Sequence, residues 1–134
     1  FASYSNGVTD TWTENWMGEL GFTMARSTNI NAAPDIGWDP RCMSGNAKYR
    51  LPAITMDAVT GAAVLANVDL AIARGCSIIL YGHDIAVGAA SLTMTTANFD
   101  TLIAGLFYRE KQGLCDIVSF SQLETALGTQ RVTA

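Results

Sequence analysis

The sequence contains a single histidine, three isolated cysteines and few charged side chains of either sign. Charged residues make up 15% of the 134 residues, with 8 lysines and arginines against 12 aspartates and glutamates. A chain with one histidine and no Cys-x-x-Cys pair cannot by itself assemble a histidine-rich zinc site. The odd number of cysteines, Cys42, Cys76 and Cys115, argues against a disulfide framework. A net charge of -4 without a basic cluster makes nucleic acid a poor candidate partner.

Other absences narrow the function classes further. No apolar stretch reaches the length of a membrane span, and no charged segment followed by an apolar one opens the chain. Walker A loops, GxGxxG, GxSxG and HExxH motifs and EF-hand loops are all missing. The chain begins at Phe1 without an initiator methionine, so we expect a processed, excised or partial polypeptide.

What the sequence does contain is a repeated order of amphipathic helix, glycine and apolar strand. A glycine after a helix can adopt the left-handed conformation that ends it. The predicted helices cover residues 11–20, 60–74 and 97–112, and the predicted strands cover residues 22–25, 76–81 and 114–120. A capping box at Ser121 and Glu124 predicts a last short helix that Gly128 ends. In the first helix, Trp12, Trp16 and Leu20 form an apolar stripe that we expect to pack in the core.

This alternation predicts an α/β fold of parallel (β/α) units in a single domain covering residues 1–134. A closed (β/α) barrel takes about 250 residues. Either the sheet is therefore open or the chain is part of a barrel. Residues 26–53 lack periodicity but contain Trp38, Met43 and Tyr49, which predicts an ordered, functional loop.

The lone histidine, His83, follows an apolar run at the end of the second predicted strand. In α/β folds the reactive groups sit just past the carboxyl ends of such strands. Imidazole exchanges protons near neutral pH, so His83 is a candidate general acid or base. A strand-end histidine that only hydrogen-bonds a neighbouring loop is the alternative, and residue type and position alone leave both open.

Several passages in order resemble the polysaccharide deacetylase family, also called the NodB-homology family or carbohydrate esterase family 4. The passages are FASYSNG at residues 1–7, GFTMARS at 21–27, the loop bearing Asp35, Trp38 and Asp39, YRLP at 49–52, IILYGHDI at 78–85 and DIVSFSQL at 116–123. They span almost the whole chain. The resemblance implies part of a distorted (β/α) barrel, specifically the carboxyl-terminal half of the domain.

The family implies a hydrolase that removes acetyl groups, N-acetyl above all, from chitin-like, cell-wall or capsule polysaccharides. It also implies a divalent metal, zinc or similar, held by an Asp-His-His triad. The family's Asp-Asp and His-x-x-x-His motifs are absent here, so we expect the metal ligands upstream of Phe1 and none in this chain. The implied partners are an acetylated polysaccharide and the amino-terminal half of the domain. The sequence does not decide whether the protein forms a homo-oligomer. The location that the resemblance implies is extracellular, cell-surface or virion-associated.

Carried over by position, His83 matches the family's general acid, which protonates the departing amine. A carboxylate of Asp35 or Asp39 matches the partner of that histidine, and the sequence does not rank the two. Trp38 matches an apolar wall beside the acetyl methyl, and Tyr4 and Gly7 match a groove loop that binds the oxyanion. The family's leucine two residues before its histidine corresponds to Tyr81, with Leu80 one step further back, and both are expected at the substrate.

The sequence also departs from the family. The arginine that orients the base aspartate would fall near Ser3, and the usual proline near Ser5. Their loss favours an alternative function, a degenerate carbohydrate-binding or structural module of a cell-surface or virion tail assembly. The retained His83 favours the enzyme.

Overall fold

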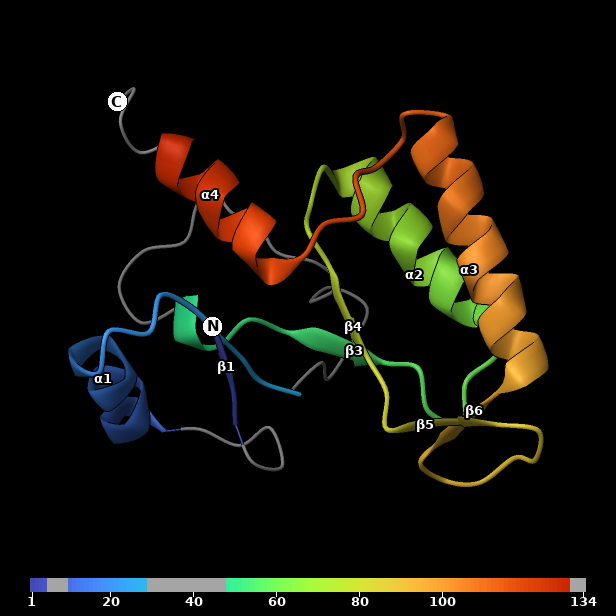
Figure 1. The fold of residues 1–134 in the computed structure, drawn as a ribbon, viewed down its shortest axis with the longest axis horizontal. Helices are drawn as coiled ribbons and strands as arrows, with labels where there is room; N and C mark the ends of the chain where they lie inside the picture. The colour runs from blue at the N-terminus through green and yellow to red at the C-terminus, as the bar shows by residue number, and fades with distance from the viewer. Residues whose placement is uncertain (5–9, 29–47, 131–134) are drawn as a thin grey trace.

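The computed structural model describes residues 1–4, 10–28 and 48–130, which form a mixed α/β fold (Figure 1). The elements in chain order are β1 (Ala2–Ser3), α1 (Thr11–Glu19), β2 (Ala25–Arg26), β3 (Ala53–Thr55), α2 (Gly61–Arg74), β4 (Ile79–Tyr81), β5 (Asp84–Ala86), β6 (Thr93–Thr95), α3 (Thr96–Lys111) and α4 (Phe120–Gln130). Each strand is only two or three residues long. Within the described residues the strands do not close into a barrel.

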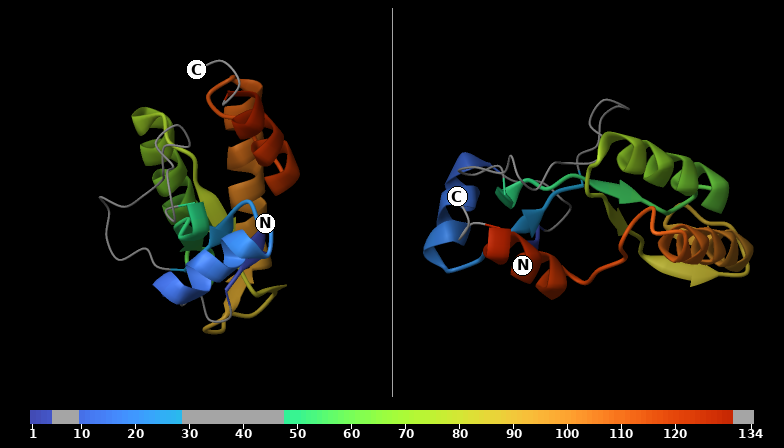
Figure 2. Two further views of the ribbon diagram at one scale, coloured as in Figure 1. Left: turned by 90° about the vertical axis from the view of Figure 1, so that its left-hand side faces the viewer. Right: turned by 90° about the horizontal axis from the view of Figure 1, so that it is seen from above.

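All strand pairs are parallel, as the alternation of helices and strands predicts. The pairs are β1 with β2, β3 with β4, and β5 with β6. A parallel bridge between Arg26 and Leu51 connects the end of β2 to the segment that leads into β3. Figure 2 shows α1 and α4 at one end of the molecule and α2 with α3 at the other, with β3 and β4 between them.

The core consists of two apolar clusters on opposite faces of β3 and β4. On one face, Val64, Met94 and Leu102 join α2, β6 and α3, with Leu80 packed against them. The other cluster contains Met24, Leu51, Ala53 and Ile79, and Phe1, Tyr81 and Leu123 pack against it. Leu123 comes from α4, so the strands lie between helical layers.

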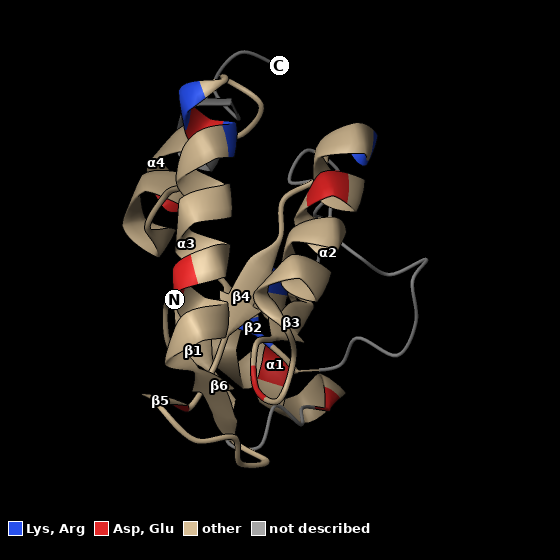
Figure 3. Cartoon of the chain, turned by 90° about the vertical axis from the view of Figure 1, so that its right-hand side faces the viewer, with Lys and Arg blue, Asp and Glu red and all other residues tan. Residues whose placement is uncertain are grey.

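α2 and α3 pack closely because two glycines lie at their contact. A Cβ at Gly61 would collide with the carbonyl oxygen of Asn98, and one at Gly105 would collide with the Leu65 side chain. Arg109 of α3 also donates two hydrogen bonds of 2.7 Å to Asp69 of α2. Figure 3 shows charges of both signs at this end of the helix pair.

The three main helices confirm the prediction from periodicity and caps. Asp10, Thr60 and Thr95 cap the amino-terminal ends of α1, α2 and α3 through their side chains. Gly75 ends α2 with a φ of 63°, in the left-handed region that suits glycine. None of the helices within residues 10–28 and 48–130 combines the length and hydrophobicity that crossing a bilayer requires.

The carboxyl-terminal region differs from the prediction in two ways. Residues 114–119 are not a strand, and Leu114, Ile117 and Val118 are about half exposed. These residues have no strand ladder to join within the described part of the chain, so their β propensity is not realised. The capping box of α4 uses Ser119 and Gln122 rather than Ser121 and Glu124, and the helix continues past residue 128.

The prediction for the apolar stripe of α1 was wrong. Trp12, Trp16 and Leu20 are 68%, 51% and 57% exposed, and the residue that α1 buries is Glu14. Glu14 accepts a hydrogen bond from Arg50, and this ion pair turns the polar side of the helix inward. The two indoles stack on each other with their ring centroids 5.5 Å apart, which shields part of their apolar surface.

Cys76 and Cys115 are partly buried.

Candidate active site

The register of β3 and β4 brings a histidine and a carboxylate together at the carboxyl end of the strands. Thr55 and Tyr81 are register partners at the ends of the two strands. Asp57 and His83 each lie two residues beyond these partners. The ladder extends past the strands, because the Met56 N–H donates to the Tyr81 carbonyl at 2.8 Å. Equal offsets from a shared register therefore place the two side chains opposite each other.

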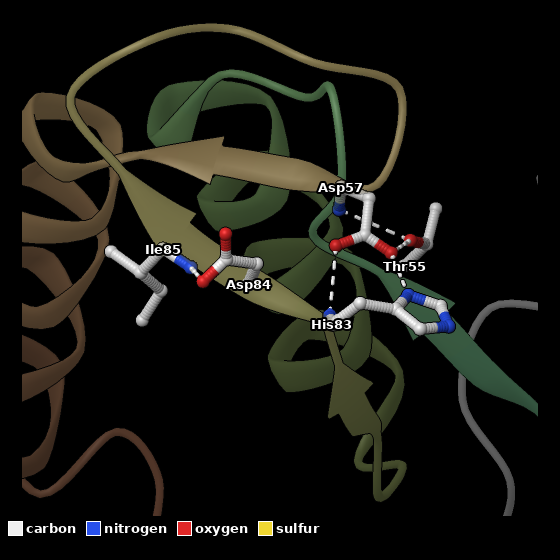
Figure 4. Close-up of polar contacts among 5 residues, drawn as sticks. All are labelled: Thr55, Asp57, His83, Asp84 and Ile85. Carbon is white, nitrogen blue, oxygen red and sulfur yellow. Dashed lines mark hydrogen bonds and ion pairs between the residues drawn. The ribbon is translucent and has the colours of Figure 1, made fainter.

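His83 and Asp57 are joined by two hydrogen bonds (Figure 4). The backbone N–H of His83 donates to Asp57 Oδ1 at 3.0 Å. The ring Nδ1 lies 2.6 Å from Asp57 Oδ2, a short hydrogen bond to a charged acceptor. Thr55 holds the carboxylate from the other side: its hydroxyl donates to Oδ2 and accepts from the Asp57 N–H, both at 3.1 Å. The backbone and the imidazole of His83 are thus fixed by the same carboxyl group.

The hydrogen bonds keep Asp57 ionised. Burial by itself would raise the pKa of Asp57, but the hydrogen bonds from the His83 N–H, the His83 ring and Thr55, with the attraction to His83, hold the pKa of this carboxyl below its ordinary value. An ionised carboxylate can only accept hydrogen bonds, so Nδ1 of His83 must be the donor. Nε2 is then the ring nitrogen that can take up or give a proton outside the pair.

The two side chains differ in their access to solvent. The Asp57 side chain is 6% exposed and the His83 side chain 55% exposed. Figure 4 shows the second ring nitrogen of His83 on the side away from Asp57. A buried carboxylate orienting an accessible imidazole is an arrangement suited to general acid or base catalysis.

The backbone around the pair is unusual at one position and crowded at another. Ala58, directly after Asp57, has a φ of 53°, the left-handed region that L residues rarely adopt. Such conformations cluster at functional sites. A Cβ at Gly82 would lie 3.3 Å from Asp57 Oδ1 and 3.2 Å from Met56 Cε. The absence of a side chain before His83 therefore allows the carboxylate to approach.

The structure separates the other predicted site residues. Tyr81 lies beside His83, with the two rings in an edge-to-face arrangement and their centroids 6.1 Å apart. Leu80 packs instead against the Val64, Met94 and Leu102 cluster, on the opposite face of β4. Tyr4 follows β1, and its N–H donates to the Arg26 carbonyl at 3.5 Å. Gly7, Asp35, Trp38 and Asp39 lie outside the described residues.

Asp57 is the site residue that sequence reasoning missed. The family resemblance implies a carboxylate partner for His83 at Asp35 or Asp39, and the sequence pattern predicts no strand before Asp57. A signal was present: the run LPAIT at residues 51–55 is followed by Asp57 and then by a helix cap at Thr60. An acidic residue between a short apolar run and a helix start resembles the placement of His83 itself.

The described residues offer few side chains that could bind a metal ion together. They contain no group of three or more histidine, cysteine, aspartate or glutamate side chains close enough to hold an ion. The His83 and Asp57 pair supplies two such groups, and Asp84 points away from it, its Oδ1 accepting the Ile85 N–H at 2.8 Å (Figure 4). The described residues therefore form no metal centre by themselves, and the ligands that the family resemblance implies would lie outside them.

Comparisons with known proteins add no family to these observations. No protein-family model matches the chain, and neither the curated proteins nor the solved structures contain a match.

Proposed function

We propose that this chain supplies the proton donor of a carbohydrate deacetylase that hydrolyses acetyl groups, N-acetyl foremost, on a polysaccharide. The observation that carries the proposal is the ion-paired His83 and Asp57 at the carboxyl end of parallel strands, with the imidazole accessible. The ordered passages that resemble the polysaccharide deacetylase family supply the reaction type.

The chain's own residues account for one part of the reaction. Hydrolysis of an N-acetyl group breaks the bond between the carbonyl carbon and nitrogen, and the departing nitrogen must gain a proton to leave as an amine. In the proposal, Nε2 of His83 gives that proton. Asp57 stays ionised and holds the Nδ1–H, which keeps the ring oriented and stabilises the imidazolium before the transfer.

The proposal includes a larger barrel. The short parallel pairs described here would be completed by further (β/α) units, and the divalent metal of the family would be held by residues outside those described. Reading the rest of the encoding polypeptide tests this part. An Asp-Asp pair and a His-x-x-x-His segment before Phe1 are expected, and the absence of both would overturn the enzyme proposal.

The direct experiment measures acetate release from acetylated oligosaccharides by the complete polypeptide. His83→Ala and Asp57→Asn are expected to reduce kcat by about 10²-fold or more, the usual contribution of a positioned acid. Asp84→Asn is the matched control, because this neighbouring carboxylate points away from His83. Unchanged release in His83→Ala would remove His83 from the chemistry.

A second candidate function is a carbohydrate-binding module without catalysis, and the indole pair of α1 favours it. Trp12 and Trp16 are stacked and largely exposed, and sugar rings pack their apolar faces on such surfaces. In this case glycan affinity would survive His83→Ala and metal chelation but fall in Trp12→Ala. Acetate release that depends on His83 would exclude this candidate as the sole function.

A further inference from the structure

A second charged group lies against Tyr81, the ring beside His83. Arg26 is the last residue of β2, and its guanidinium carbon lies 4.7 Å from the centroid of the Tyr81 ring. The same Tyr81 ring lies edge-to-face with the His83 imidazole, with the centroids 6.1 Å apart. Arg26, Tyr81 and His83 therefore form a continuous row of side chains in contact.

Within the described part of the chain, one guanidinium nitrogen of Arg26 lacks the hydrogen-bond acceptor that Arg50 and Arg109 each have. Arg26 Nη1 is excluded from solvent and has no hydrogen-bond acceptor there. By contrast, Arg109 is paired with Asp69 through two bonds, and Arg50 is paired with Glu14. A buried charged donor without an acceptor carries an uncompensated desolvation cost. An oxygen atom brought by a ligand would remove this cost.

The geometry points to the chemical class of that ligand. The guanidinium carbon of Arg26 lies over the Tyr81 ring, 4.7 Å from its centroid, and the N–H groups of an arginine lie in the plane of its fork. A planar carboxylate matches this fork with two parallel hydrogen bonds. We propose that Arg26 binds a carboxylate group beside Tyr81, the neighbour of His83, and that this group is the acetate released by hydrolysis. The identity of the carboxylate rests on the proposed function, whereas the site itself does not.

NMR of the complete polypeptide makes the test specific. The imidazole signals of His83 are those that disappear in His83→Gln. Sodium acetate is titrated at neutral pH and constant ionic strength, and the affinity is read from the shifts of the His83 ring and the Arg26 side chain. Sodium glucuronate is titrated in parallel, because an acidic sugar carries the same group.

The comparison of variants decides the outcome. Arg26→Gln is expected to weaken acetate binding by about tenfold or more, the loss of a charge-assisted hydrogen bond. Lys111→Gln, at the far end of α3, removes the same charge and is expected to leave the affinity unchanged. Arg26→Lys keeps the charge without the planar fork, so weaker binding is expected there too, and it carries the test where Arg26→Gln does not fold.

Equal affinities in the parent chain, Arg26→Gln and Lys111→Gln would overturn the proposal. Glucuronate bound more tightly than acetate, with the same dependence on Arg26, would keep the site but assign the carboxylate to an acidic sugar. The deacetylase proposal fails separately: Arg26-dependent acetate binding without acetate release from oligosaccharides would retain the site and exclude the reaction.

Discussion

Replacing Asp57 by asparagine is expected to invert the tautomer of His83. The ionised carboxylate accepts from Nδ1, which leaves Nε2 without a proton in the neutral ring. An asparagine of the same shape presents an amide N–H group to one of its two partners. If its oxygen keeps the backbone N–H of His83, its nitrogen faces Nδ1, which must then become an acceptor. The neutral ring would then carry its proton on Nε2. This is the opposite of the Nδ1–H tautomer that the proposed proton transfer from Nε2 leaves behind.

The cost in stability follows from the bonds that asparagine cannot keep. Asp57 accepts from the His83 N–H at 3.0 Å, His83 Nδ1 at 2.6 Å and Thr55 Oγ1 at 3.1 Å. Asparagine retains an acceptor for the first and loses the charge that strengthens all three. Hydrogen bonds to charged groups contribute about 1.5–3 kcal/mol each. Because water can replace the partner of the half-exposed His83 ring, we expect a loss of about 2 kcal/mol for the set.

Nitrogen-15 NMR at a pH where the ring is neutral distinguishes the two tautomers. The parent protein should show the Nδ1–H form and Asp57→Asn the Nε2–H form, with the His83 signals identified as those missing from His83→Gln. Urea unfolding at unchanged m value measures the stability loss. Asp84→Asn, which loses only a local contact to the Ile85 N–H, should change neither. An Nε2–H tautomer in the parent chain would refute the reasoning.

Three further outcomes test the surroundings of the site. Hydrogen bonding lowers the pKa of Asp57 below the unfolded value of about 3.9. The ionised carboxylate therefore stabilises the fold above about pH 3.9, and this stabilisation is lost as the pH falls through the folded pKa. Asp57→Asn should flatten the acid side of a plot of stability against pH. Ala58→Gly should stabilise the chain by about 1 kcal/mol in urea unfolding, since it relieves a φ of 53°; a loss of stability would contradict this. Gly61→Ala should lower stability by about 1–3 kcal/mol, because the new Cβ meets backbone atoms of α3, whereas Gly88→Ala, with nothing within 4 Å, should be close to neutral in the same assay.

The helices could be predicted because their signals are local. Thr60 and Thr95 stand directly before apolar stripes with the helical period, and each caps its own helix. Nothing outside the segment is needed to form such a cap. The same reasoning failed for α1, where the burial of Glu14 depends on Arg50, a residue distant in sequence. Periodicity identified the helix but not the face that is buried.

Of the two residues of the candidate site, the sequence predicts His83 but not Asp57. His83 was found because it ends a conspicuous apolar run. Asp57 follows a strand of three residues, too short to stand out, and it becomes significant only when that strand pairs with β4. The choice of partner for a strand is not local information, and parallel pairs are formed across a crossover. The strand predicted over residues 114–120 failed for the same reason, since propensity does not provide a neighbour.

The candidate site therefore requires one exact register of β3 and β4, whereas stability requires only that the two strands pair. A slip of one residue would turn every side chain of a strand to the opposite face, which would move Asp57 away from His83 while the strands stayed paired. The ladder opposes this slip at both ends of the pair: Ala53 and Ile79 pack in the core at one end, and the Met56 bond to Tyr81 continues the register up to the site at the other. Thr55, whose hydroxyl holds Asp57, is itself the register partner of Tyr81. The residues that align the two strands thus also align His83 with Asp57.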